Sequence, residues 1–107
     1  MNPKFPLVCN MDVFTASQRE AHIQNTTELI QAVQSVQEVG NGYELSFPSE
    51  TEFICKIAEF ITNERLCCPF LNFTLSVFSN REPVSLSLTG PIGTQEFLRA
   101  EFEGVFQ

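Results

Sequence analysis

The sequence has no tryptophan, one tyrosine and one histidine among its 107 residues. Basic residues are also scarce, since six lysines and arginines stand against 13 aspartates and glutamates and give a formal net charge of -7 at pH 7. Proteins that bind nucleic acid or anionic membranes present basic surfaces to phosphate groups, so this balance argues against both kinds of partner. The one histidine, His22, falls in a polar helical segment. There it is expected at the surface, and not as a metal ligand or a base.

Long apolar runs are absent as well. No stretch approaches the roughly 18 apolar residues that a membrane-spanning helix needs. Residues 1–8 lack the apolar core of a secretory signal peptide. We therefore expect a cytoplasmic protein, in a compartment that keeps thiols reduced.

The cysteines lack two informative spacings. None of the four forms a CxxC pair, which excludes zinc ribbons and thioredoxin-type sites, and they do not have the spacing of a secreted disulfide framework. Cysteines in a cytosolic protein of this kind are either buried packing residues or reactive and metal-binding groups. The four are Cys9, Cys55, Cys67 and Cys68.

The length fits a single domain, residues 1–107, and a 43% hydrophobic composition with 11 phenylalanines suffices for a core without disulfides or metal. Two candidate capping boxes, Thr15 with Gln18 and Ser49 with Glu52, mark helix starts. After an extended lead-in over residues 1–13, apolar periodicity predicts helices over 16–31, over 50–66 and after Gly93, and strands over 33–39, 43–47, 71–77 and 84–89.

The predicted order of elements is α-β-β-α-β-β-α. Because the strands come in pairs joined by short turns, this order favours a four-stranded antiparallel sheet over a parallel one. The strands alternate apolar residues with serine, threonine and asparagine, so the helices should pack mainly on one face of the sheet. The sequence therefore predicts an α+β fold.

The end of the second predicted helix carries the most informative residues. Glu64 lies on the same helical face as Ile57 and Phe60, and an unpaired carboxylate is costly to bury among apolar side chains. It therefore requires a cation, a hydrogen-bond donor or a metal. Cys67 and Cys68 follow three and four residues later, which places them on neighbouring surface if the helix continues.

The two adjacent thiols can share a thiophilic metal ion such as zinc. Cys9, in the lead-in, is the candidate third thiol ligand, and Arg19 and Arg65 are candidate supporting cations for the carboxylate. Cys55 is a poor candidate, because it lies twelve residues before the adjacent pair, roughly 18 Å away along the helix axis.

Several segments also carry a resemblance to a known family. Cys9-Asn10-Met11, Glu64-Arg65-Leu66-Cys67-Cys68-Pro69-Phe70, Leu88-Thr89-Gly90-Pro91 and Glu96-Phe97-Leu98 are the clearest of them. Residues 9–103 resemble a family of small, functionally uncharacterised bacterial proteins with an N-terminal Cys, an "ERxCCPF" core and a closing "LTGPxGxxEFL" segment. The resemblance implies that Cys9, Arg19, Glu64, Cys67 and Cys68 are shared positions and that Cys55 is not. The family has an acidic residue where this chain has Asn10, so no ligand role is carried over to that position.

Two functions from different classes follow from these observations. The first is binding of a soft metal ion, or chemistry of reactive thiols, at Cys9, Cys67 and Cys68 with Glu64 as a direct or nearby oxygen donor. The alternative is a non-catalytic interaction or structural module, for example a homodimer, whose cysteines are buried packing residues. Hydrolytic or nucleophilic catalysis ranks third, because a thiol nucleophile has no evident base in the sequence.

Overall fold

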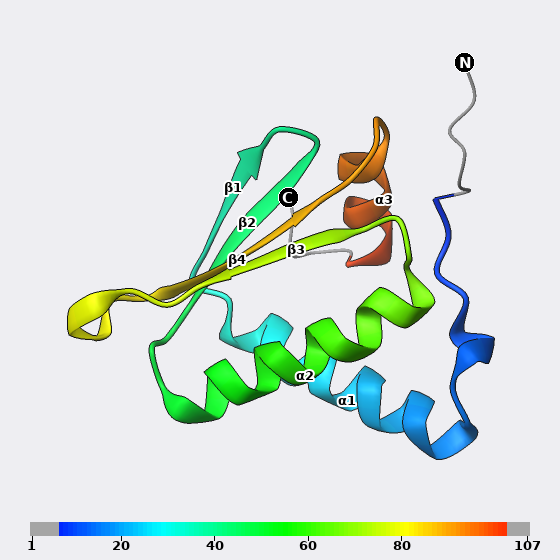
Figure 1. Ribbon diagram of the computed structural model, residues 1–107, viewed down its shortest axis with the longest axis horizontal. Coiled ribbons are helices and arrows are strands. Elements are labelled where there is room, and N and C mark those ends of the chain that lie inside the picture. Colours follow the sequence, from blue (N-terminus) through cyan, green and yellow to red (C-terminus); the bar gives the residue numbers. More distant parts are fainter. Residues whose placement is uncertain (1–6, 103–107) are drawn as a thin grey trace.

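The computed structural model describes residues 7–102 and has the predicted α+β architecture (Figure 1). Within this part of the chain the order α-β-β-α-β-β-α is confirmed, and no helix is long and apolar enough to span a bilayer. Residues 1–6 of the predicted lead-in lie outside the described residues, and the lead-in forms a short 3-10 helix before α1 instead of staying extended. The elements are η1 Met11–Val13, α1 Ala16–Ala32, β1 Ser35–Val39, β2 Gly42–Phe47, α2 Thr51–Cys67, β3 Asn72–Ser76, η2 Ser79–Arg81, β4 Val84–Thr89 and α3 Thr94–Glu101.

The four strands form one antiparallel sheet in the order β1-β2-β4-β3. The register sets Leu45 of β2 opposite Leu86 of β4, and Phe73 of β3 opposite Leu88 of β4. Because successive side chains alternate between faces, this register collects the apolar residues of the strands on one face and the serines and threonines on the other. Helices α1 and α2 run side by side along the sheet, and α3 lies at the end where β2 begins (Figure 1).

The core lies between the apolar face of the sheet and one face of α2. Ile57 and Phe60 of α2 and Phe47 of β2 are almost fully buried. The rings of Phe60 and Phe73 meet edge to face, with their centroids 6.3 Å apart. This packing fixes the rotation of α2 about its axis, and Glu64, one turn beyond Phe60, therefore faces the interior.

One of the two predicted capping boxes is present. The Thr15 hydroxyl accepts a hydrogen bond from the Gln18 amide, and the Gln18 side chain accepts one from the Thr15 amide. The box predicted for Ser49 and Glu52 is wrong. Extended backbone continues through Glu50, which becomes the N-cap without a side-chain hydrogen bond, so α2 begins one residue later than that box requires.

Polar contacts fix how α1 lies on α2. The Asn25 side-chain amide donates to the Lys56 backbone oxygen at 3.0 Å, and the Lys56 ammonium lies 2.9 Å from a Glu28 carboxylate oxygen. His22 lies one turn before Asn25 on the same face of α1. The contacts that orient α1 therefore also turn His22 toward α2.

The β1–β2 hairpin yields a prediction about stability. A Cβ added at Gly42 would overlap the Leu88 backbone oxygen on the neighbouring strand, whereas a Cβ at Gly40 would meet open space. We expect Gly42→Ala to lower the free energy of unfolding by about 3 kcal/mol, and Gly40→Ala, which is strained only by its positive φ, by about 1 kcal/mol. Urea unfolding of the two variants measures the difference. Equal losses would contradict the β2–β4 register.

Candidate metal and thiol site

The end of α2 gathers three of the predicted site residues. Pro69 cannot continue a helix and disfavours helical backbone at the residue before it, so α2 ends at Cys67. Cys68 has left the helical region, with φ -121° and ψ 74°, but its amide still donates to the Glu64 carbonyl at 2.8 Å. The side chains of Glu64, Cys67 and Cys68 thus stay together at the helix end. Cys67 and Cys68 are 0% exposed and Glu64 is 5% exposed.

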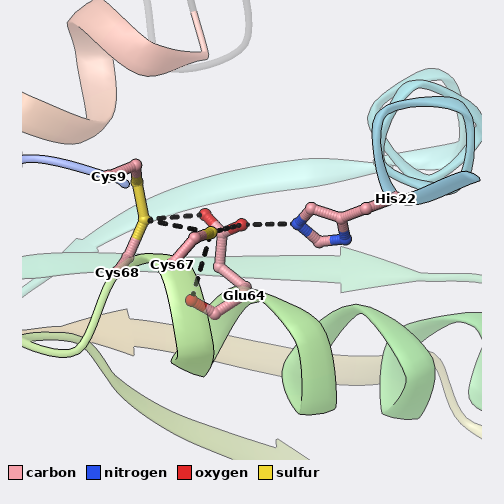
Figure 2. The surroundings of a disulfide bond; sticks show 5 residues. All are labelled: Cys9, His22, Glu64, Cys67 and Cys68. Carbon is pink, nitrogen blue, oxygen red and sulfur yellow. Dashed lines mark hydrogen bonds and ion pairs between the residues drawn. A yellow bond between two sulfur atoms is a disulfide. The ribbon is translucent and has the colours of Figure 1, made fainter. Parts of the chain in front are cut away.

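The segment before α1 crosses this helix end and supplies the fourth residue. The Asn10 amide donates to the Cys67 backbone oxygen at 2.7 Å and so satisfies one of the free carbonyls at the end of α2. This contact brings Cys9 beside Cys68, with the two Cα atoms 4.5 Å apart, and the two sulfurs form a disulfide (Figure 2). The sequence makes Cys9 a candidate third ligand but does not predict the bond, because it indicates reduced thiols.

Four potential ligand atoms converge at this point. One atom from each of Cys9, Glu64, Cys67 and Cys68 lies within 4.8 Å of the others. Cys67 Sγ lies 3.8 Å from Cys68 Sγ and 3.5 Å from Glu64 Oε1, and Cys68 Sγ lies 3.5 Å from Glu64 Oε2. Cys67 is a free cysteine, so its thiol donates to the Glu64 carboxylate or backbone oxygen. With the disulfide reduced, the four residues can hold a metal ion.

His22 is a member of the site, and its prediction as a surface residue is wrong. It is 4% exposed, and its Nε2 lies 2.8 Å from Glu64 Oε1 (Figure 2). Its ring contacts those of Phe14 and Phe60, at centroid distances of 5.4 Å and 5.7 Å. The buried face of α1 consists of Leu29 and two polar residues, His22 and Asn25. The pattern of apolar residues alone therefore does not identify this face. The signal that could have found His22 is Glu64, whose burial requires a partner.

The remaining predicted residues lie apart from the cluster. Arg19 is 3.8 Å from Asp12, and Arg65 makes no ion pair with any residue between 7 and 102. Neither arginine pairs with Glu64, whose partner is the His22 imidazole of α1. Cys55 is an exposed free thiol on α2, in keeping with its exclusion from the candidate site.

A cavity of about 210 Å³ lies beside the cluster. Its wall includes Cys9 and Glu64 from the cluster and Glu101 from the end of α3, but neither Cys67 nor Cys68. Burial, followed by the charge of the Glu64 carboxylate, raises the pKa of Glu101 above its usual range. The cavity thus borders Cys9, one of the two cysteines of the disulfide.

No protein-family model, curated protein or solved structure gives a significant match to this chain. The expected membership of a bacterial family with an "ERxCCPF" core therefore stays a prediction. The chemistry of the site is inferred from its donor atoms, their distances and their burial.

The His22–Glu64 pair yields a prediction about coupling. Replacing one partner leaves the other buried without its counterpart, so we expect His22→Leu and Glu64→Leu each to cost about 3 kcal/mol of unfolding free energy. The double variant removes both polar groups and should cost clearly less than the sum of the two. Denaturant unfolding of the three variants measures this coupling. Additive losses would show that the two side chains do not stabilise one another.

The Cys67 thiol yields a prediction about pH. Burial, followed by the charge and hydrogen bond of Glu64, raises the pKa of Cys67 from 9.0 to about 12. As pH rises between these values, the unfolded chain loses this proton while the folded protein keeps it, so folding becomes less favourable. The stabilisation is complete below pH 9 and is lost as the pH approaches 12. Thermal unfolding at a series of alkaline pH values should therefore show a shallower decline for Cys67→Ala than for the unaltered chain.

The matched control for that experiment is Cys55→Ala, which removes an exposed thiol from the same helix. It should keep the full alkaline decline. Identical slopes for all three proteins would show that the Cys67 proton does not contribute to the pH dependence of folding.

Proposed function

We propose that the reduced protein binds a thiophilic metal ion through Cys9, Cys67 and Cys68, with Glu64 as an oxygen donor. The observation that carries the proposal is the convergence of these four ligand atoms within 4.8 Å. Three sulfurs and one carboxylate oxygen suit a soft or borderline ion such as zinc rather than magnesium or calcium, which prefer oxygen ligands.

The distances between the donors support a four-coordinate site. Two thiolates that each lie about 2.3 Å from a tetrahedral zinc ion are separated by about 3.8 Å, and a thiolate and a carboxylate oxygen by about 3.6 Å. Cys67 and Cys68 Sγ are 3.8 Å apart, and each sulfur is 3.5 Å from a different oxygen of Glu64. The α2 donors are thus close to ligand spacing before any ion is present.

The surroundings of the cluster favour an ion over free thiolates. A thiolate at Cys67 is strongly disfavoured without a cation, because burial and the Glu64 carboxylate raise the pKa of its thiol to about 12. A dipositive ion supplies the missing charge and displaces the proton. His22 Nε2 holds Glu64 Oε1 at 2.8 Å, in the way that hydrogen-bonded partners orient ligating carboxylates.

The disulfide is the oxidised form of the same site. It withdraws Cys9 and Cys68 from coordination and leaves Cys67 and Glu64, which are too few donors for a closed structural zinc site. Ion binding therefore requires reduction, and the oxidised protein serves as an internal reference in the experiment that follows.

The proposal is tested by titrating zinc, and cadmium as a spectroscopic probe, into reduced and oxidised protein under anaerobic conditions. We expect one ion per chain in the reduced protein, with a thiolate-to-cadmium charge-transfer band, and no such band in the oxidised protein. Cys67→Ser removes a proposed ligand and should weaken binding by more than about 100-fold. Loss of a residue that only hydrogen-bonds to a ligand weakens binding by at most about that factor. His22→Gln should weaken it by roughly 10- to 100-fold.

Cys55→Ser is the matched control, because it removes a thiol from the same helix outside the cluster. It should bind the ion like the unaltered chain. A reduced protein that binds neither ion would contradict the proposal and favour the alternative, in which the buried cysteines are packing residues of an interaction module. Loss of binding in Cys55→Ser as well would place the ion elsewhere.

A further inference from the structure

The two sulfurs of the disulfide differ in their surroundings. Cys68 is 0% exposed, and Glu64 Oε2 and Cys67 Sγ lie 3.5 Å and 3.8 Å from its sulfur. Cys9 is only partly buried and lies on the wall of the cavity of about 210 Å³. A molecule in that cavity reaches the disulfide at Cys9, whereas Cys68 is covered by the protein.

We propose that Cys9 is a modification site for a small thiol, which enters the cavity, attacks Cys9 Sγ and forms a mixed disulfide there. The proposal does not depend on metal binding, although exchange at Cys9 also frees the thiols that the ion site would need.

The exchange step balances without an external oxidant. The incoming thiol loses its proton to solvent, and its thiolate forms a new bond to Cys9 Sγ as the Cys9–Cys68 bond breaks. Its sulfur is oxidised to the mixed disulfide, while the Cys68 sulfur is reduced and takes up one proton from solvent. A second thiol then attacks the mixed disulfide, releases the small-molecule disulfide and leaves Cys9 as a thiol.

Because a bare thiolate is disfavoured in the buried site beside the Glu64 carboxylate, Cys68 must be protonated as it leaves. Glu64 Oε2 lies 3.5 Å from Cys68 Sγ, where it can accept a hydrogen bond from the new thiol. Attack at the other sulfur would have to pass through the buried cluster. The direction of exchange, with Cys9 modified and Cys68 released, therefore follows from burial on one side and open space on the other.

The charge of the cavity indicates which small thiols it favours. Glu101 and the hydrogen-bonded pair of Glu64 and His22 are on its wall, and no lysine or arginine is among its lining residues in the described part of the chain. The chain as a whole has a formal net charge of -7. A thiol with an ammonium group is therefore attracted, and a thiol with a carboxylate is repelled.

The test uses the oxidised protein with a metal chelator present and compares cysteamine with mercaptoacetate. After acid quenching and alkylation of free thiols, peptide mass spectrometry locates each adduct. We expect the mixed disulfide on Cys9 and a free thiol on Cys68. The rate of each thiol with the protein is divided by its rate with a small neutral disulfide. At low ionic strength this ratio should be roughly three to ten times larger for cysteamine than for mercaptoacetate, and salt should reduce the difference.

Two variants separate the parts of the proposal. Glu101→Gln should reduce the preference for cysteamine and keep the adduct on Cys9, whereas Cys55→Ser should change neither. An adduct on Cys68, the absence of any adduct, or an oxidised protein without the Cys9–Cys68 bond would overturn the modification site. An adduct on Cys9 without a charge preference would overturn the aminothiol selectivity. Because the chelator is present throughout, these outcomes are independent of whether the reduced protein binds an ion.

Discussion

The burial of one carboxylate, Glu64, is the constraint on which the site depends. At 5% exposure, this group has lost nearly all its contact with water, so its charge must be compensated by the protein. His22 Nε2 lies within hydrogen-bond distance of this carboxylate from a different helix, and the Cys67 thiol donates a hydrogen bond to it. A buried pair of this kind contributes little net stability relative to apolar packing, but its loss on one side is costly. The α1–α2 packing and the site are therefore linked through one side-chain contact.

The second constraint is the crossing of the lead-in over the end of α2. Its backbone hydrogen bond from Asn10 to Cys67 closes a helix end that would otherwise leave a carbonyl unsatisfied. The disulfide at the same crossing joins cysteines 59 residues apart, and a loop of that length corresponds to a chain-entropy stabilisation of roughly 4 kcal/mol. The bond that stabilises the fold is also the one that removes two donors from the ion site. Stability and ion binding therefore oppose each other at this crossing.

Most of the fold could be predicted from the sequence, because its elements have strong periodicity. Apolar residues alternate along β3 and β4 and form one stripe along α2. The first pattern predicts strands and the second a helix, and the structure has both. The start of α2 differs from the prediction, because Ser49 and Glu52 have the right spacing for a capping box but the backbone stays extended one residue longer. A side-chain pattern does not show where the backbone leaves the extended region.

The sequence predicts only part of the site, because local side-chain patterns show only local structure. Glu64, Cys67 and Cys68 are close in sequence, so helical geometry alone brings them together. His22 lies 42 residues from Glu64, and its position depends on how α1 rotates on α2. The contacts of Asn25 and Glu28 with Lys56 set that rotation, and no local pattern encodes it. The disulfide differs from the expected reduced thiols, because that expectation rests on the predicted compartment and not on geometry.

The origin of the four donors also indicates which of them moves. Glu64, Cys67 and Cys68 belong to a single helix end whose backbone is fixed by the core and by Pro69, so their spacing is set before anything binds. Cys9 belongs to a segment outside this helix and is held there by the disulfide and the neighbouring Asn10 hydrogen bond. A change between the disulfide and a coordinated ion requires the sulfurs of Cys9 and Cys68 to separate to ligand spacing. That separation is less costly in the partly buried lead-in than in the close-packed core. Cys9 is thus the adaptable member of a cluster whose other three donors are rigid.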